Sequence, residues 1–340
     1  MFIYNPIYAL VLFIIVSVIL LVLFYPKKGW FWIIKAYYKK DEKTIIEDIL
    51  KQLYNNEDSG KDIDIKNLAG VLKFNNKQII ETVKKMTINA LVFFDSNNIK
   101  LTNSGREYAL KIVRVHRLWE RYLADKTGFN KTEWHDRAEL MEHKLNHEET
   151  NILASQLGNP KVDPHGDPIP TKTGKIAEVV GVALPLLPVG SMGRITHIED
   201  EPDIIYKQIL AENVHLGSFI RVVENNETRI VFHAEGEEVK LAPIVAANLT
   251  ISLIENDIVL EEKIARLSSL KEYETAKIIG ISKESRGESR RRLLDLGFVK
   301  GAKISIDLMN PLGEPNAYLI KGTAIALRTN QASKILIKKD

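Results

Sequence analysis

The sequence predicts an α+β protein that joins an N-terminal transmembrane helix to helical and β-rich domains, and three observations support this fold class. An uncharged apolar run occupies residues 7–25. The segments between residues 42 and 151 place apolar residues at helical spacing. After Pro170, short β-branched runs alternate with turn residues, which is typical of strands. A chain of 340 residues is long enough for two or three domains.

The composition excludes several kinds of chemistry. The formal net charge is +3, which is too small to indicate a class of partner. The chain has no cysteine, so disulfides, thiolate zinc sites, iron–sulfur clusters and thiol nucleophiles are excluded. Any metal must be held by imidazole and carboxylate groups, which suit Mn²⁺, Fe²⁺, Co²⁺ or Zn²⁺.

The first element, residues 1–40, is predicted to be a transmembrane anchor with its juxtamembrane segment. Residues 7–25 have the length of a bilayer-spanning helix and no polar stripe. A cleaved signal peptide is the alternative, but the chain lacks a basic start and a small-residue cleavage site. Lysines and aromatic residues follow the run, as on the cytoplasmic side of a membrane. We therefore expect a single-pass protein of the inner (cytoplasmic) membrane, with its N-terminus outside and its other domains in the cytoplasm.

The second element, residues 41–103, has the pattern of a winged helix-turn-helix. Residues 42–56 carry a helical apolar stripe, and residues 63–88 fit two helices joined by a short turn at 74–76. Two β-rich runs around Asp-Ser-Asn-Asn then predict a hairpin.

The second helix of this motif is the candidate DNA-recognition helix. Polar side chains at its start could contact base edges, and two later lysines could contact phosphates; these residues are Asn75, Asn76, Lys77, Gln78, Lys84 and Lys85. Residues 61–103 hold seven Lys against four Asp or Glu. The alternative is a winged helix kept only for dimerisation or protein contacts.

The third element, residues 104–170, contains a candidate metal site. In "HDRAELMEH", His135, Glu139, Glu142 and His143 are three or four residues apart and share one helix face. His116 and Glu120 have the same spacing on the preceding helix. Two such helices could enclose a six-coordinate ion. A solvated, salt-bridged helix face is the alternative, and it is the interpretation we give to residues 147–149.

The last two elements, residues 171–258 and 259–340, are predicted to be tandem β-barrels. Segments at 187–198, 210–223 and 238–251 have weak counterparts at 273–281, 293–306 and 323–337. Each copy supplies a strand, a short helix, another strand and a closing pair of strands.

The order of motifs from about Thr44 to Pro170 resembles the diphtheria toxin repressor family of metal-dependent regulators. The matching motifs are Leu-Thr-x-x-Gly-Arg, His-Arg-Leu-x-Glu, His-Asp-x-x-Glu-x-x-Glu-His and Pro-His-Gly-Asp-Pro-Ile-Pro. The resemblance implies paired metal sites and a dimer interface on the two helices. One site would use His116, Glu120 and His135. The other would use Glu139, Glu142 and His143, completed by Glu47 from the first helix.

The same resemblance bears on the metal. Glu139 stands where the iron-type members have cysteine and the manganese-type members have glutamate, so it implies Mn²⁺ or Fe²⁺, two ions per protomer. Thr44 stands where a further carboxylate or a methionine would be expected.

The final barrel resembles the FeoA-type domain, a small SH3-like barrel that serves bacterial ferrous-iron transport as a cytoplasmic accessory. The matching positions are Leu293, Gly297, Gly301, Pro311, Leu312, Gly313, Pro315, Gly322 and Leu327. Arg290 to Arg292 could form a partner-binding patch or only a solvated helix start. The first barrel occupies the place of the repressors' SH3-like domain, which can donate metal ligands. Its candidates are His197, Glu199, Glu201 and His215.

These features together predict a membrane-anchored, Mn²⁺- or Fe²⁺-dependent transcriptional regulator of iron or manganese homeostasis. It would bind palindromic double-stranded DNA as a homodimer. The alternative is an accessory subunit of a ferrous-iron transporter in which the winged helix is vestigial. No nucleophile–base pair or phosphate loop is present, so no enzymatic activity is predicted. A zinc hydrolase is disfavoured because no separate general base is evident.

Overall fold

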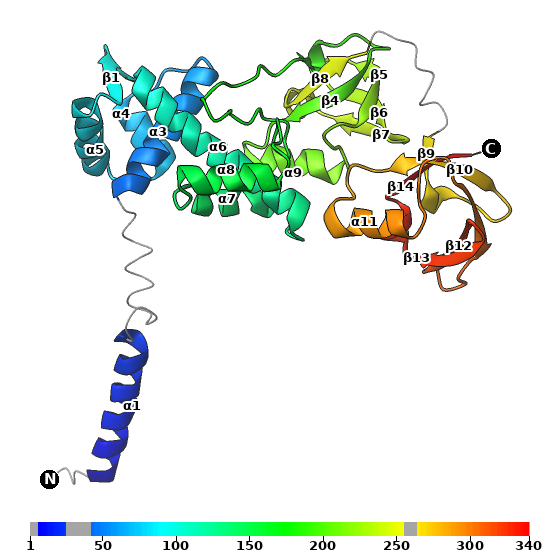
Figure 1. The fold of residues 1–340 in the computed structure, drawn as a ribbon, viewed down its shortest axis with the longest axis horizontal. Helices are drawn as coiled ribbons and strands as arrows, with labels where there is room; N and C mark the ends of the chain where they lie inside the picture. The colour runs from blue at the N-terminus through cyan, green and yellow to red at the C-terminus, as the bar shows by residue number, and fades with distance from the viewer. Residues whose placement is uncertain (1–5, 25–41, 255–263, 340) are drawn as a thin grey trace. The chain divides into compact units, whose positions relative to one another are not determined.

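The computed structural model describes residues 6–24, 42–254 and 264–339 (Figure 1). The chain divides into two compact units, Met1–Ile112 and Val113–Asp340. The predicted juxtamembrane segment, residues 25–40, and the predicted domain boundary at residue 258 lie outside the described residues.

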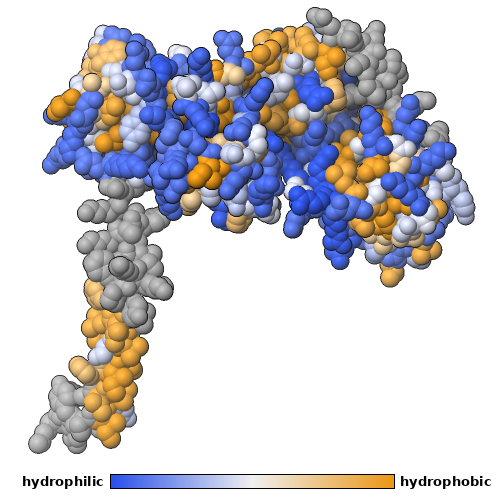
Figure 2. All heavy atoms as spheres, in the orientation of Figure 1, coloured by the Kyte–Doolittle hydropathy of each residue, from blue (hydrophilic) through white to orange (hydrophobic). Residues whose placement is uncertain are grey.

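The first helix, α1 (Pro6–Phe24), consists of uncharged, almost entirely apolar residues, and Figure 2 shows its apolar surface. Within the described part of the chain, however, no helix is long and apolar enough to cross a membrane. This finding contradicts the predicted transmembrane helix and, with it, the single-pass localisation.

The rest of the first unit begins with three helices, α3 (Glu42–Asp58), α4 (Ile65–Leu72) and α5 (Asn76–Ile88). The side chain of Asp64 caps the start of α4 by accepting from the Asn67 N–H, and Asn75 caps α5 in the same way. The three helices bury one apolar face each, and their core includes Ile49, Leu50, Leu53, Leu68, Ile79, Val83 and Met86.

A two-stranded hairpin, β1 (Val92–Asp95) and β2 (Asn98–Leu101), follows these helices. Its register pairs Val92 with Leu101, and its turn places Ser96 at a φ of 58°. The Leu101 N–H donates to Glu57 Oε1 of α3 at 2.8 Å, which holds the hairpin against that helix.

The second unit contains the predicted metal ligands between residues 116 and 143, although α6 itself begins in the first unit. α6 (Asn103–Lys126) leads to a short 3₁₀ turn, η1 (Lys131–Glu133), and then to α7 (Trp134–Glu142) and α8 (His147–Gln156). Residues 147–149, which the sequence led us to interpret as a solvated helix face, therefore lie on a different helix from His135 and Glu139. Asn146 and Glu149 form a reciprocal capping box, so residues 147–149 open a new helix instead of ending the ligand helix.

Two six-stranded sheets form the rest of the second unit. The first has the order β3-β8-β4-β5-β6-β7 and the second β13-β12-β11-β10-β14-β9. The first contains β3 (Val182–Ala183), β4 (Met192–Ile198), β5 (Phe219–Asn225), β6 (Ile230–Ala234), β7 (Glu237–Leu241) and β8 (Leu249–Leu253). The second contains β9 (Ile264–Arg266), β10 (Thr275–Ile281), β11 (Lys303–Leu308), β12 (Asn316–Ile320), β13 (Thr323–Leu327) and β14 (Ile335–Lys339).

The two sheets have the same topology. Reversing the order of the second sheet gives β9-β14-β10-β11-β12-β13, and each strand then corresponds to the strand at the same place in the first sheet. Each sheet carries two short helices, α9 (Asp203–Ala211) and α10 (Pro243–Ala246) in the first and α11 (Gly287–Asp295) and α12 (Thr329–Ala332) in the second. Each also encloses its own hydrophobic core. The weak sequence repeat thus corresponds to a structural repeat.

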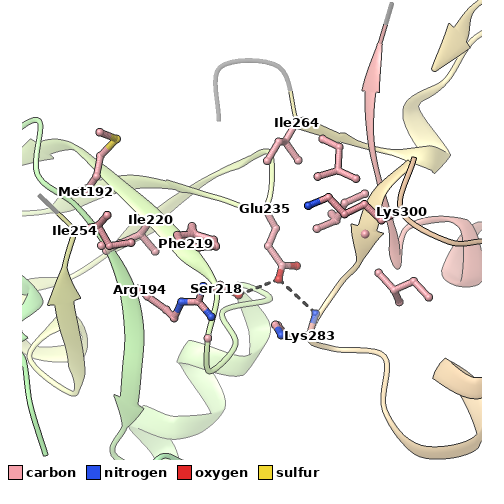
Figure 3. A pocket seen from close by; sticks show the side chains of 16 residues that line it. Met192, Arg194, Ser218, Phe219, Ile220, Glu235, Ile254, Ile264, Lys283 and Lys300 are labelled. Atoms are coloured by element: carbon pink, nitrogen blue, oxygen red, sulfur yellow. Dashed lines mark hydrogen bonds between the residues drawn. The ribbon is translucent and has the colours of Figure 1, made fainter. Parts of the chain in front are cut away.

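A buried polar cluster joins the two barrels. Glu235, at the end of β6, accepts from Ser218 Oγ at 2.9 Å and from Ser282 Oγ of the second barrel at 2.6 Å. All three residues are buried, so their hydrogen bonds are shielded from water and fix the second barrel on the first. Beside them lies a pocket of about 300 Å³ with mostly apolar walls (Figure 3).

Candidate metal centre

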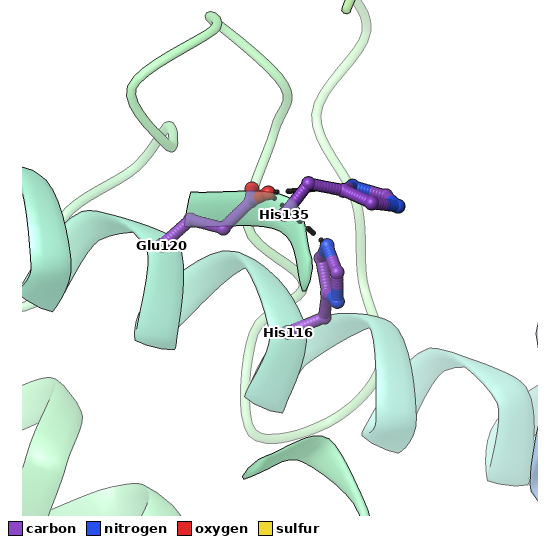
Figure 4. Close-up of side chains that lie close together, drawn as sticks. All are labelled: His116, Glu120 and His135. Carbon is purple, nitrogen blue, oxygen red and sulfur yellow. Dashed lines mark hydrogen bonds and ion pairs between the residues drawn. The ribbon is translucent and has the colours of Figure 1, made fainter. Parts of the chain in front are cut away.

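His116, Glu120 and His135 form the centre of the candidate site (Figure 4). Glu120 Oε1 lies 3.2 Å from His116 Nε2 and 3.6 Å from His135 Nδ1. The two imidazole rings meet edge to face at 5.0 Å. His116 and Glu120 are one turn apart on α6, and His135 is in the first turn of α7. The structure therefore brings together three of the predicted ligands.

Two residues that the sequence analysis did not select as ligands extend this centre. Glu120, His165 and Asp200 also place potential ligand atoms within 4.8 Å of one another. His165 Nε2 lies 3.7 Å from Asp200 Oδ2, and His135 Nδ1 lies 3.7 Å from the same oxygen. Glu120 belongs to both sets, so four other donors surround it and the centre has five donors in total.

The loop that carries His165 is held rigidly. Asp163 Oδ1 accepts from the N–H groups of three successive residues, 165 to 167, at 2.8–2.9 Å. The carbonyl oxygen of His165 accepts from the Ile198 N–H of β4 at 2.8 Å. Arg117 Nη1 of α6 donates to the Pro168 carbonyl at 2.6 Å. These bonds attach the loop to both the first barrel and the ligand helix.

The donor set fits a divalent transition metal. His165 Nε2 is buried and has no hydrogen-bond partner among the described residues. Burying a polar atom without a partner costs free energy, and a bound ion would remove that cost. Three imidazoles and two carboxylates suit Mn²⁺, Fe²⁺ or Zn²⁺. Ligand atoms about 2.1 Å from an ion and at right angles lie about 3 Å apart. The observed 3.2–3.7 Å separations need only a small contraction.

Glu120 is ionised in this arrangement. Burial raises the pKa of its carboxyl group, but the neighbouring His116 and His135 outweigh burial and hold that pKa well below its usual range. The carboxylate needs no deprotonation before it can bind a cation, so the imidazoles are the groups at which protons compete with metal.

Glu142 contacts the centre through Nδ1 of the His116 ring. Its Oε2 lies 2.5 Å from His116 Nδ1, on the far side of the ring from Glu120. An ionised carboxylate at Nδ1 keeps the proton on that nitrogen and leaves the Nε2 lone pair for a metal. The other oxygen of Glu142 lies 3.6 Å from His143 Nε2. Glu139 is 54% exposed and lies 3.6 Å from His135 Nε2.

Glu47 is placed within the first unit. It is buried, accepts from Tyr108 Oη at 2.7 Å and lies 3.6 Å from Lys43 Nζ. Burial and the hydrogen bond to Glu47 raise the pKa of Tyr108. Glu47 thus has partners from its own unit.

The four candidates on the first barrel lie outside the two overlapping clusters, which together contain five donors. His197 Nε2 is 3.6 Å from Asp167, and His215 Nδ1 is 2.9 Å from Lys131 Nζ. Glu201 reaches His135 Nε2 at 3.7 Å. Asp200, between the candidates Glu199 and Glu201, is the residue that joins the cluster. The predictions for His197, Glu199, Glu201 and His215 therefore stay predictions, and Asp200 is an additional candidate ligand from the same segment.

The predicted DNA-contacting residues lie on or next to α5 and are all exposed. Asn75 Oδ1 accepts from the Lys77 N–H at 3.0 Å, so this side chain caps the helix. Lys85 Nζ lies 2.5 Å from Glu42 Oε1 of α3. The hydrogen bond to Glu42 raises the pKa of Lys85. Asn76, Lys77, Gln78 and Lys84 remain the side chains that point into solvent from the exposed face.

Comparison with known proteins identifies two parts of the chain. Residues 102–171 match the family described as "Iron dependent repressor, metal binding and dimerisation domain". Residues 265–339 match the FeoA domain family. The first match covers the ligand helices and the loop of His165, and the second covers the final barrel.

Individual relatives extend these matches. The Iron-dependent repressor IdeR of Mycobacterium leprae is 26% identical over 222 residues, which are 58% of this chain and 96% of that protein. A solved "Manganese-dependent transcriptional repressor complex with manganese" superposes with a TM-score of 0.56 at 28% identity, covering 61% of this chain and 99% of that one.

A third relative matches this chain over a shorter stretch. A "Probable metal transport system membrane protein" of Chlamydia trachomatis is 45% identical over 85 residues, so this chain spans 19% of its length. The two relatives covered almost completely are repressors, which confirms the prediction that the chain is not an enzyme. Residues 102–171 thus match the metal-binding and dimerisation domain of iron-dependent repressors, residues 265–339 match the FeoA domain, and about 60% of the chain is similar to metal-dependent repressors of the diphtheria toxin repressor/IdeR type.

Proposed function

We propose that the chain is a transcriptional repressor whose DNA binding depends on Mn²⁺ or Fe²⁺ held around Glu120. The observation that carries this proposal is the convergence of His116, Glu120, His135, His165 and Asp200. A relative named for iron and a solved structure named for manganese support the class of metal. Glu139, in place of the cysteine of the iron-type members, favours Mn²⁺.

The ligands explain how a metal would act as a switch. They come from α6, α7, the loop after α8 and the segment after β4. Binding one ion requires these four segments to hold one mutual arrangement. The metal therefore favours that arrangement, by an amount set by the difference between its affinity for this arrangement and its affinity for the others. Glu139, Glu142 and His143 are our proposed ligands for a second ion in each protomer.

The DNA-binding surface we propose is the exposed start of α5. Asn76 and Gln78 can form paired hydrogen bonds with adenine, and Lys77 can reach guanine or phosphate. A helix-turn-helix dimer reads two half-sites about one helical turn apart, so the proposed operator is palindromic. Dimerisation through the helical metal-binding domain would supply the two copies of α5 that such a site requires.

An electrophoretic mobility shift of the full chain tests the proposal. With DNA from upstream of its own gene, we expect a shift in the presence of Mn²⁺ or Fe²⁺ that chelation with EDTA abolishes. A shift that is equally strong with EDTA, or absent with every upstream fragment and both metals, would refute a metal-dependent repressor.

Substitutions on α5 should separate base reading from phosphate binding. Gln78→Ala should cost about 1–3 kcal/mol of operator binding and leave non-specific binding unchanged. Lys84→Ala should weaken both kinds of binding and lower the slope of log affinity against log salt by about 1. Lys85→Ala is the matched control, because Glu42 already neutralises this lysine. Equal losses on operator and random DNA for Gln78→Ala would contradict base reading.

The alternative role as a transporter subunit is not favoured. The relatives covered over nearly their whole length are repressors, whereas the metal-transport relative is matched over only 19% of its length.

A further inference from the structure

A second pocket, which has polar walls and a volume of about 480 Å³, lies where three parts of the second unit meet. Residues 124–134 of the helical domain form one wall and residues 210–215 of the first barrel form another. The third wall comes from residues 284–289 and Lys334 of the second barrel. None of the five donors of the metal centre lines this pocket, so it is a separate feature.

The charged side chains of the pocket are mainly cationic. Lys131, Arg286 and Lys334 line it together with one carboxylate, Glu284. Lys334 Nζ lies 3.7 Å from Glu284, which leaves Lys131 and Arg286 without a carboxylate at ion-pair distance in the described chain. Burial lowers the pKa of Arg286, and burial together with Arg286 lowers that of Lys131 to about 8. An anion between these two cations would offset the free-energy cost of keeping both groups charged in a buried place.

A helix N-terminus opens onto the same pocket. α11 begins after Arg286, and no side chain caps its first turn. Uncapped N–H groups at a helix start attract phosphate and other oxyanions. The hydroxyls of Ser285 and Ser289 are also among the lining groups. Ser285 is 2% exposed, and its Oγ has no hydrogen-bond partner among the described residues.

His215 adds a second buried donor without a partner. Lys131 Nζ donates to its Nδ1 at 2.9 Å. Burial and the nearby Lys131 and Arg286 lower the pKa of His215 to about 2, so the ring is neutral. Its single N–H must therefore be on Nε2, because Nδ1 accepts. His215 is 3% exposed, and no acceptor reaches this Nε2 within the described residues.

We propose that this pocket binds the phosphate group of a small molecule, through Lys131, Arg286, Ser285, Ser289, His215 and the start of α11. Every one of these groups donates, and the two buried donors, Ser285 Oγ and His215 Nε2, have no acceptor among the residues that the structure describes. The volume exceeds what one phosphate fills, so an organic phosphate ester fits better than the free ion. Such a ligand would connect the helical domain to the FeoA domain, and Trp134, which lines the pocket, directly precedes the metal-centre residue His135.

Isothermal titration calorimetry of the full chain, without added metal and in chloride buffer at pH 7.5, tests this site. Inorganic phosphate and adenosine monophosphate are the probes. We expect saturable binding, tighter for the ester than for the free ion. Arg286→Gln should weaken binding at least 10-fold, whereas Arg291→Gln, an exposed arginine of the same helix outside the pocket, should change it less than 2-fold.

Ser285→Ala separates ligand binding from folding. Removing a buried hydroxyl without a partner should leave the melting temperature unchanged or raise it, yet it should weaken binding of the ester several-fold. Absence of saturable heat with both probes, or equal affinities for the Arg286→Gln and Arg291→Gln variants, would overturn the proposal. Because no metal is added, the result does not depend on the repressor function.

Discussion

Replacing Glu120 with glutamine is expected to weaken Mn²⁺ binding about 100-fold or more. Glu120 is the one residue shared by both donor clusters, and its pKa is held well below the usual range by His116 and His135. Glutamine keeps the size and one oxygen but removes the negative charge, which is the main attraction for a hard divalent cation. Calorimetric titration of the metal-free chain with Mn²⁺ measures the change directly.

The matched control is Glu148→Gln, an exposed glutamate in the first turn of α8 that belongs to neither cluster. It removes the same charge from the same domain, so it should leave the Mn²⁺ affinity within 2-fold. A Glu120→Gln variant that is folded by circular dichroism and binds Mn²⁺ like the wild type would exclude this centre as the metal site. Loss of the metal-dependent DNA shift should accompany loss of binding.

Local patterns were sufficient to predict the parts of the site that lie on helices. His116 and Glu120 are four residues apart on α6, and this spacing alone puts them on one face. Likewise, α4 and α5 lie where the apolar stripes and the short turn predict them. Such periodicities depend only on neighbours in sequence, so a single sequence contains them.

The rest of the centre depends on contacts between distant residues. His165 and Asp200 join Glu120 from positions 45 and 80 residues further along the chain, and no spacing rule indicates that distance. The motif Pro-His-Gly-Asp-Pro contained His165, but it marked a loop and not a ligand. The break between α7 and α8 was not predicted, because residues 147–149 were interpreted as a solvated helix face and Asn146 was not recognised as a cap.

Gly166→Ala is the second substitution with a large expected effect, because it tests the loop that positions His165. Gly166 has a φ of 102°, and a Cβ there would lie 2.1 Å from the Thr196 carbonyl oxygen of β4. The positive φ alone costs an alanine about 1–2 kcal/mol, and the β4 backbone or the loop must also move. We expect a total loss of roughly 3 kcal/mol in unfolding free energy, measured by urea denaturation.

The same displacement should lower the Mn²⁺ affinity about 10-fold, because His165 follows the loop while the other four donors stay in place. Gly158→Ala is the matched control: Gly158 also has a positive φ, 76°, but nothing lies within 4 Å of its would-be Cβ. This variant should lose only about 1 kcal/mol and keep its Mn²⁺ affinity. If both variants lose stability equally and both keep full affinity, then neither the contact with Thr196 nor the position of His165 matters to the site. If Gly166→Ala alone loses affinity, the rigid loop is part of the metal centre, and the five-donor arrangement is the one that binds the ion.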